Sequence, residues 1–457
     1  MRTKERSLQT ARLWTPFIMK KCIAFSFFIF YCSFFIHPAA AAGLLTYRYQ
    51  HHIFTIAPAD HPEWRTPAET WTYNGVPIEP QSEWRVDGDK MPDLPPGIAR
   101  TGTFSLDRDA IGRTIKKTVA AQLDRPAGSV VIRREKKPSE KSGSGSIVFD
   151  GVGLTGRVVD ISIASDLTAA AIERGLTEIE LPVVETQPEV RVEDSALVAQ
   201  GIREVVTIGE SFFAGSPVNR RHNIGVGLRK FNGTTIAAGE VFSFNKVLGA
   251  VNAETGYRKE LVIKGDRTEP DFGGGLCQIS TTAYRGIWEY GFPIFKRKNH
   301  SYTVRYYAPP GTDATVYPGS VDMVFKNNLP GALLIQTHQE KDRAYFIYYG
   351  TRDARKTELV GPFLYDRKDP PPDRTELTTD LPPGEKKKLN ERVPGLKSVW
   401  YRFVTTGTGS RTMEAVYSHY EARPLFTALG VLQLPEGYAE IGSGALLPQG
   451  DIRLPIR

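Results

Sequence analysis

Cysteine is almost absent from this chain: its 457 residues include only Cys22, Cys32 and Cys277. The first two lie in an apolar stretch near the start, so a chain that loses this stretch keeps one free thiol and no internal disulfide. Cysteine and histidine pairs at metal-ligand spacing are also missing, as are a phosphate loop and a dinucleotide fingerprint. We therefore expect no cofactor and no metal, and any covalent chemistry points to Cys277.

Long apolar runs are missing beyond residue 36, so no later segment is expected to cross a membrane. Near the start, a charged segment at 19–21 precedes an apolar run at 22–36, and small residues follow a proline at 38–43. This order predicts a Sec signal peptide at 1–42, and hence an extracytoplasmic protein that is secreted, periplasmic or in the cell wall. An uncleaved membrane anchor is the alternative.

The chain also lacks a large net charge of either sign once its first residues are set aside. The formal net charge is +7, but residues 1–41 carry six basic residues and one acidic residue, so the rest of the chain keeps only +2. Proteins that bind nucleic acid usually carry a strongly basic surface. We therefore expect no nucleic-acid partner.

The chain beyond its start is long enough for several domains, and its patterns predict an α+β multidomain protein. Apolar positions recur at helical spacing over 109–123, and a strand-like run follows at 129–132. Prolines at 370–372 indicate a stiff, exposed linker. We expect a signal peptide at 1–42, a β-rich and loop-rich leader at 43–100, a small α+β module at 101–200, a mixed α/β domain at 205–352 and a β-rich module at 375–457.

Turn residues predict two hairpins. Asn232-Gly233 lies between the runs 228–231 and 234–236, and Gly-Thr-Gly-Ser separates the strand-like runs 400–406 and 413–418. Short turns of this composition between alternating apolar residues are typical of β-hairpins.

The segment at 205–352 carries several motifs in a fixed order. Residues 273–282 read Gly-Gly-Gly-Leu-Cys-Gln-Ile-Ser-Thr-Thr, His300-Ser301 follows, and Asp313 opens Asp-Ala-Thr. Together these motifs resemble the VanW family, named after a protein of glycopeptide-resistance clusters, over roughly one third of the chain. Where that family usually has Pro-Gly-Glu, this chain has Ala238-Gly239-Glu240, a change that affects a turn.

Helical spacing follows the lone cysteine. The apolar residues Ile279, Ala283 and Ile287 recur every four residues, and Gly291 supplies a stop. This pattern predicts a helix with Cys277 in its first turn. A thiol at a helix N-terminus has a lowered pKa, because the helix dipole stabilises the thiolate. A buried, small apolar residue is the alternative for this cysteine.

The residues around the thiol predict an oxyanion or substrate-binding loop. Flexible glycines let backbone N–H groups approach a substrate, so we expect this role near Gly274, Gly275, Leu276 and Gln278. The side chain of Gln278 is a further candidate donor, and an ordinary surface glutamine is the alternative.

His300 is the candidate general base, or the imidazolium of an ion pair with the cysteine, and it precedes a strand predicted at 302–307. Asp313 is the candidate that orients this histidine or a substrate amine. Ser301 and His222 are secondary candidates. The alternatives are a surface histidine at a strand start and an aspartate in a turn.

Some proteins with VanW domains act as cysteine L,D-transpeptidases, and the resemblance implies the same activity here. Cys277 would attack a peptidoglycan stem peptide, form a thioester and expel D-alanine, and an amine of a neighbouring stem would take the acyl group. The partners would be peptidoglycan stem peptides at the cell-envelope surface. Residues 101–200 resemble, more weakly, the peptidoglycan-binding-like domain often found upstream of VanW domains, and a plain α+β spacer is the alternative.

Two further interpretations of the whole protein stay open. The first is a cysteine-dependent cell-wall peptide hydrolase, in which water takes the acyl group. The second is a non-catalytic accessory protein of peptidoglycan binding or glycopeptide resistance, in which the cysteine is merely buried.

Overall fold

The computed structural model of the protein describes residues 43–79, 96–135, 145–264 and 267–435, and the structural statements below concern these residues. The signal peptide predicted at 1–42 lies outside them. Within the described ranges, no helix combines the length and the apolar composition needed to span a membrane.

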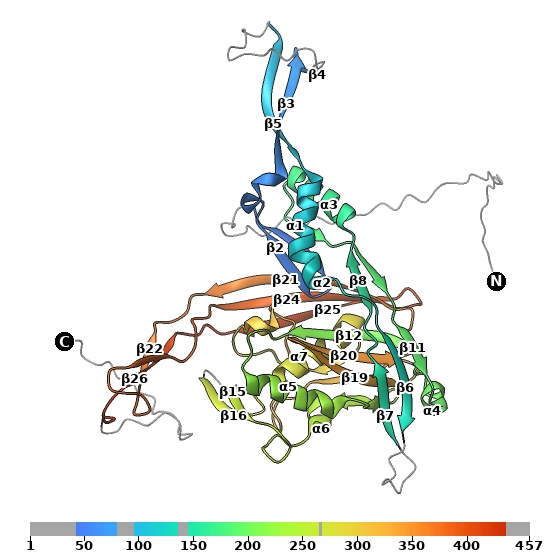
Figure 1. Ribbon diagram of the computed structural model, residues 1–457, viewed down its shortest axis with the longest axis vertical. Helices are drawn as coiled ribbons and strands as arrows, with labels where there is room; N and C mark the ends of the chain where they lie inside the picture. The colour runs from blue at the N-terminus through green and yellow to red at the C-terminus, as the bar shows by residue number, and fades with distance from the viewer. Residues whose placement is uncertain (1–42, 80–95, 136–144, 265–266, 436–457) are drawn as a thin grey trace, which may run out of the picture. The chain divides into compact units, whose positions relative to one another are not determined.

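The architecture is α+β, with many small sheets and few helices, as the sequence predicts in outline (Figure 1). Three helices begin directly after an aspartate, Asp107, Asp160 or Asp194, whose side chain accepts a hydrogen bond from a backbone N–H of the first turn. The described α-helices are α1 (Arg108–Ile115), α2 (Ala121–Leu123), α3 (Ile161–Arg174), α4 (Ser195–Ala199), α5 (Val218–Phe231), α6 (Phe244–Leu248) and α7 (Leu276–Tyr290).

The N-terminal part of the described chain forms several small sheets. Its strands are β1 (Leu45–Tyr49), β2 (His52–Ile56), β3 (Arg65–Tyr73), β4 (Val76–Ile78), β5 (Ile98–Leu106), β6 (Ser129–Glu135), β7 (Ser146–Gly151), β8 (Gly156–Val159), β9 (Glu178–Glu180), β10 (Val183–Thr186) and β11 (Glu189–Val192). Strand β1 pairs with β2 in antiparallel fashion and with β9 in parallel. Tyr47 and Trp64 share a hydrophobic core with Ile111 and Ile115, so the boundary expected at residue 100 runs through one core.

The central sheet has the order β12-β20-β19-β13, formed by β12 (Glu204–Phe212), β20 (Arg343–Gly350), β19 (Leu333–Glu340) and β13 (Thr235–Ile236). Both faces of this sheet are covered. Phe346 and Tyr348 pack into the core that contains α5 and α7, whereas Ile347 and Tyr349 point to the other face and meet β6 and β11. The alternation of side chains along a strand therefore explains why β20 is buried over almost its whole length.

Helix α7 lies directly on the central sheet (Figure 1). A Cβ atom at Gly209 of β12 would come within 1.9 Å of the carbonyl oxygen of Thr282, and one at Gly286 would lie 2.5 Å from the nitrogen of Gly209. Glycine at these two positions lets the helix and the strand approach backbone to backbone, which sets the height of the helix above the sheet.

Two predictions of local structure in this domain are wrong. The run 228–231 is the last turn of α5, because Ile224, Leu228 and Phe231 are buried at helical spacing, so Asn232-Gly233 follows a helix and forms no hairpin. The stretch 302–307 forms no strand and ends in a 3-10 turn at Arg305–Tyr307. The remaining strands of the domain are β14 (Val241–Ser243), β15 (Lys259–Lys264), β16 (Arg267–Phe272), β17 (Ile294–Lys296) and β18 (Val324–Lys326).

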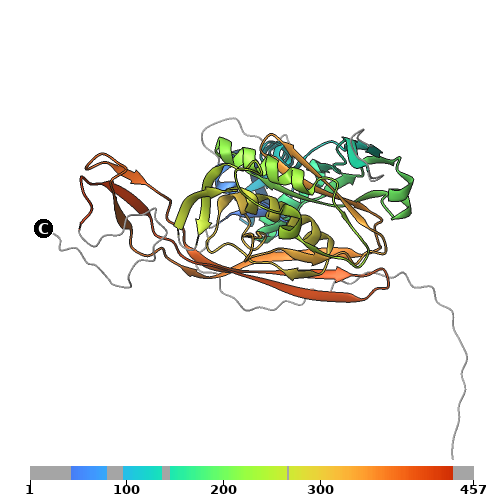
Figure 2. The same cartoon turned by 90° about the horizontal axis from the view of Figure 1, so that it is seen from below.

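The C-terminal part contains two further sheets, with strands in orange to red in Figure 2. The strands predicted at 400–406 and 413–418 are confirmed as parts of β24 (Gly395–Thr405) and β25 (Arg411–Tyr420). These two strands pair with each other, and β24 also pairs with β21 (Lys356–Lys368). Trp400 of β24 packs edge-on against Trp288 of α7, with ring centres 5.6 Å apart. The smaller sheet contains β22 (Arg374–Thr378), β23 (Lys386–Lys388) and β26 (Phe426–Gly430).

A buried cluster of charges connects the N-terminal part with the central sheet. Glu210 of β12 is 4% exposed and binds Arg125 and Arg157 at 2.6 and 2.9 Å and His52 at 2.5 Å. Burial raises the pKa of Glu210, but the positive charges, first that of Arg157, lower it well below its usual value. Glu210 therefore stays ionised and holds three side chains of the N-terminal part against the strand that supports α7.

We predict that Trp400→Ala lowers the free energy of unfolding by about 3 to 5 kcal/mol, because it removes a fully buried ring between the C-terminal sheet and α7. Tyr417→Ala, on the exposed face of β25, is the matched control and should cost less than about 1 kcal/mol. Urea denaturation measures both values, and equal losses would contradict the proposed packing of this sheet on α7.

Candidate active site

The glycines before Cys277 bring three backbone segments together. A Cβ atom at Gly274 would lie 2.8 Å from the carbonyl oxygen of Leu261, and one at Gly275 would lie 3.2 Å from that of Arg220. Gly275 also has φ +117°, which a side chain rarely permits. Helix α7 can therefore start between β15 and α5, and this start places Cys277 in its first turn, as predicted from the helical spacing.

One backbone amide at the start of α7 is free to bind an oxyanion. The N–H groups of Leu276 and Gln278 donate to the carbonyl oxygens of Gly273 and Gly275, both at 3.0 Å. The N–H of Cys277 has no hydrogen-bond partner in the described part of the chain. The amide of the cysteine itself is thus an available donor in the first turn.

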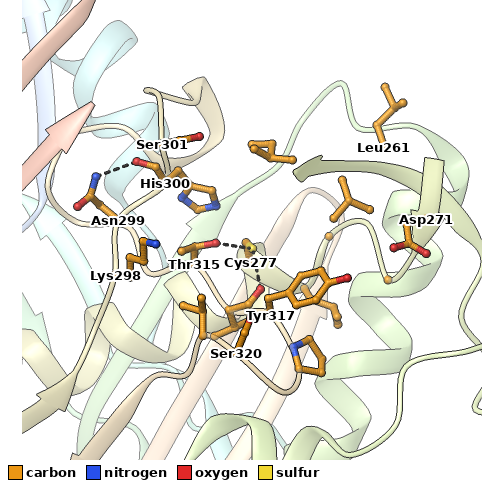
Figure 3. A pocket seen from close by; sticks show the side chains of 18 of the residues that line it. Leu261, Asp271, Cys277, Lys298, Asn299, His300, Ser301, Thr315, Tyr317 and Ser320 are labelled. Carbon is orange, nitrogen blue, oxygen red and sulfur yellow. Dashed lines mark hydrogen bonds between the residues drawn. The ribbon is translucent and has the colours of Figure 1, made fainter. Parts of the chain in front are cut away.

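The thiol of Cys277 is partly buried and has two oxygen neighbours. Its sulfur lies 3.3 Å from the hydroxyl oxygen of Thr315 and 3.6 Å from the carbonyl oxygen of Val316. Figure 3 shows the sulfur and the imidazole of His300 facing the same pocket. These contacts orient the sulfur without covering it.

His300 is held by the carboxylate of Asp313. The Nδ1 atom of the imidazole and the backbone N–H of His300 lie 2.6 and 2.8 Å from the same oxygen of Asp313. The imidazole is 3% exposed and stacks on the ring of Tyr307, with centres 4.5 Å apart. Its Nε2 atom is buried and makes no hydrogen bond of ordinary geometry among the described residues, which leaves it available toward the thiol.

Asp313 receives further donors on its second oxygen. The hydroxyl of Tyr420 donates to it at 2.5 Å, and the guanidinium of Arg297 lies 3.1 Å away. Both carboxylate oxygens are thus bonded in a place where the residue is only 2% exposed. A buried charge with this many partners stays ionised and immobile.

The pKa values of the three groups are coupled. Burial raises the pKa of Asp313, but the hydrogen bond and charge of His300 outweigh burial and lower it well below its usual range. Burial lowers the pKa of His300, whereas Asp313 and Cys277 raise it to about 9. Burial raises the pKa of Cys277, but His300 and then Thr315 lower it to about 7. A thiolate beside an imidazolium is therefore favoured between about pH 7 and pH 9.

The thiol opens into a pocket of about 730 Å³. Apolar side chains of β15 line it, among them Leu261 and Val262, and charged side chains line other parts, among them Lys298 and Asp271 (Figure 3). The pocket thus has the size of an ordinary ligand site and offers both apolar and charged walls.

The structure places the other predicted site residues as follows. Gly275, Leu276 and Ser301 line the pocket with Cys277 and His300. Gln278 is fully buried, and its side-chain amide donates to Ser211 at 2.8 Å and accepts from Arg220 at 2.9 Å.

Two more of the predicted residues lie away from the lining. Gly274 is buried below it, and its carbonyl oxygen accepts a hydrogen bond from Asn223. His222 lies on α5, where its Nε2 atom is 2.8 Å from the carbonyl oxygen of Gly256, and it does not line the pocket.

Sequence reasoning missed four residues of the site: Arg220, Arg297, Thr315 and Tyr420. Thr315 belongs to the Asp-Ala-Thr motif and could have been included on that ground. Arg297 lies in the basic turn before His300, a weaker signal. Arg220 and Tyr420 have no local signal, because Tyr420 lies 107 residues beyond Asp313 in the chain and Arg220 lies on a separate helix.

No cluster of three histidine, cysteine, aspartate or glutamate side chains suited to a metal ion occurs in the ranges that the structure describes.

The fold and the site define an α+β protein in which a cysteine and a histidine line one pocket and an aspartate is bonded to the histidine. A family model described as VanW like protein matches residues 219–349. The uncharacterized protein YoaR of Bacillus subtilis is 30% identical over 236 residues, which cover 51% of this chain and 72% of that relative. This chain belongs to the VanW family.

The Vancomycin B-type resistance protein VanW of Enterococcus faecalis is 27% identical over 116 residues, which cover 24% of this chain and 42% of that protein. The chain thus spans less than half the length of this second relative. No solved structure matches the chain.

We predict that the alkylation rate of Cys277 by iodoacetamide rises with pH around a midpoint of about 7, because the thiolate is the nucleophile. Asp313→Asn removes the charge that keeps His300 protonated and should move the midpoint upward by about one pH unit or more. Stopped-flow or mass-spectrometric labelling gives the midpoint. His338→Gln, outside the pocket, is the control and should leave it unchanged. A wild-type midpoint near 9 would contradict the ion pair.

Proposed function

We propose that this protein is an exported cysteine acyltransferase of the cell envelope, an L,D-transpeptidase that acts on peptidoglycan stem peptides. The proposal rests on Cys277 and His300, which line one pocket, and on Asp313, which does not line the pocket but is bonded to the Nδ1 atom of His300. A nucleophile, a general acid-base group and an orienting carboxylate in this relation are the parts that covalent acyl transfer requires.

In the first half of the reaction, the thiolate of Cys277 attacks the carbonyl carbon of the donor stem. The carbonyl oxygen becomes an oxyanion, which the free N–H of Cys277 can bind. The imidazolium of His300 gives its Nε2 proton to the leaving nitrogen as the C–N bond breaks. Alanine departs as a free amino acid, and the donor remains as a thioester on Cys277.

In the second half, the neutral imidazole of His300 takes a proton from the attacking amine of a neighbouring stem. The amine forms an amide bond with the acyl carbon, and the C–S bond breaks to return the thiolate and the imidazolium. When water attacks in place of the amine, the same steps yield hydrolysis. The choice of acceptor therefore separates a transpeptidase from a hydrolase with the same nucleophile.

Three observations support the substrate class and the location. The motifs at 273–282 and 313–315 resemble those of a family in which L,D-transpeptidases occur. The name of the Enterococcus faecalis relative links the family to vancomycin resistance. The charged and apolar start of the chain, followed by small residues, supports export.

We predict that the protein without residues 1–42 converts tetrapeptide-stem muropeptides into cross-linked dimers, detected by mass spectrometry. Cys277→Ser should lower the rate by about 1,000-fold or more, and His300→Gln by about 100-fold or more, because each removes a participant in the bond-making steps.

His338→Gln is again the control and should retain full activity. Shortened stems without dimers would favour the hydrolase. Equal sacculus binding by the wild type and Cys277→Ser, with no product from either, would overturn the enzymatic proposal in favour of a wall-binding accessory protein.

We also predict a bell-shaped pH profile of kcat/KM. Activity should rise as the Cys277 thiol ionises near pH 7 and fall as His300 loses its proton near pH 9, because the leaving nitrogen needs that proton. Initial rates between pH 5 and pH 10.5 give both limbs. An activity that keeps rising through about pH 10 would show that His300 is not the acid.

A further inference from the structure

Arg220 is a cation near the N-terminus of α7, and the reaction scheme above gives it no role. It lies in the first turn of α5, and its side chain passes over the start of α7: a Cβ atom at Gly275 would lie 3.4 Å from its Cγ atom. Arg220 lines the same pocket as Cys277. The aliphatic part of its side chain thus lies beside Gly275, two residues before the nucleophile, and its guanidinium reaches the side chain of Gln278, the residue after it.

The guanidinium is positioned by neutral groups only. One terminal nitrogen donates to the side-chain oxygen of Gln278 at 2.9 Å and to the hydroxyl of Tyr307 at 3.2 Å, and the group lies 4.8 Å from the ring centre of Tyr306. Its Nε atom is buried and has no hydrogen-bond partner among the described residues. A buried charged donor without a partner is costly, and a ligand that binds it removes that cost.

The charge of Arg220 is also unpaired. Arg297, the other arginine close to the site, is bonded to Asp313, whereas Arg220 has no ion pair in the part of the chain that the structure describes. Lys298 supplies a second cation to the pocket wall but is exposed, so water screens it. The partly buried cation that lines the pocket with the thiol is therefore Arg220, and it attracts anions more strongly than an exposed lysine.

We propose that Arg220 binds the free carboxylate of the residue that follows the attacked carbonyl, so that the site selects peptides ending one residue after the scissile bond. This inference rests on the proposed acyl transfer and deepens it. The amino acid that leaves after the attack carries its carboxylate carbon three bonds from the attacked carbonyl carbon. The carboxylate can therefore contact Arg220 while the carbonyl carbon is at Cys277. A peptide that continues beyond that residue carries a neutral amide there and leaves the cation unpaired.

The same observations support two alternative roles of Arg220 less well than they support carboxylate binding. The first is a purely structural role. Arg402 also has an unbonded buried Nε, but it is paired with Glu414 and lies outside the pocket, whereas Arg220 lines the pocket and has no ion pair among the described residues. An arginine that only raised thiol reactivity would act equally on charged and neutral reagents. The decisive measurement is therefore a comparison of two reagents that differ by one carboxylate.

The first experiment compares alkylation of Cys277 by iodoacetate and by iodoacetamide at one pH. Both reagents require the thiolate, so the ratio of their rates cancels any change in its pKa. Arg220→Gln should lower the ratio of the iodoacetate rate to the iodoacetamide rate by about tenfold, the value of one charge-assisted hydrogen bond. Arg220→Lys keeps the charge and should retain part of the preference.

Two matched controls accompany this measurement. Arg221→Gln changes the next residue of α5, whose guanidinium binds Asp342 and does not line the pocket, and Lys298→Gln removes the exposed cation. Both should leave the ratio within about twofold of the wild type. An unchanged ratio in Arg220→Gln, or an equal fall in Lys298→Gln, would overturn the inference.

The second experiment uses two donor stems, one ending in a free carboxylate and one ending in a carboxamide. The wild type should favour the free acid through a lower KM, and Arg220→Gln should raise KM for the acid by about tenfold while leaving the amide unchanged. Equal turnover of both stems by the wild type would overturn the inference even if Arg220→Gln failed to fold.

The two experiments separate this inference from the proposed function. No turnover of any stem, together with an iodoacetate preference that requires Arg220, would keep the carboxylate site and reject the transpeptidase. Turnover of stems without any dependence on Arg220 or on the terminal carboxylate would keep the acyltransferase and reject the role of Arg220.

Discussion

The buried carboxylate of Asp313 is the group on which the arrangement around Cys277 depends. An ionised group in the interior is stable only when donors surround it, and here His300, Arg297 and Tyr420 supply them. Each donor is fixed in turn, so the imidazole presents Nδ1 to the carboxylate and Nε2 to the pocket. The lowered pKa of the thiol follows, because the imidazolium that Asp313 stabilises is what favours the thiolate.

Part of the site comes from outside residues 219–349, the range that the family model matches. The hydroxyl of Tyr420 accepts the N–H of Gly311 as well as donating to the carboxylate, and the indole of Trp400 donates to the carbonyl of Pro310. The loop that carries the aspartate is therefore shaped between α7 and the C-terminal sheet. The C-terminal sheet therefore belongs to the site, because its packing sets the position of the Asp313 carboxylate.

The motif glutamine, Gln278, links the two sides of the helix start. It is fully buried, donates to Ser211 of the central sheet and accepts from Arg220 of α5. A glutamine can do both at once because its amide has a donor and an acceptor. Gln278 thereby connects Arg220 to the central sheet, which also supports α7. The same sheet therefore fixes the positions of both the thiol and Arg220.

The sequence by itself determined the local chemistry: the helix that starts at Leu276, the glycines before it, the stop at Gly291 and the place of Cys277, because helical spacing and glycine conformation act over a few residues. It also indicated His300 and Asp313 as candidates, but only the tertiary structure decided that they meet. The strand predicted at 302–307 is wrong: the stretch ends in a 3-10 turn, and the carbonyl of Tyr307 at its end accepts a hydrogen bond from the buried Arg285. Contacts of this kind, like that of Tyr420 with the aspartate, join segments far apart in the chain, and local periodicity carries no information about them.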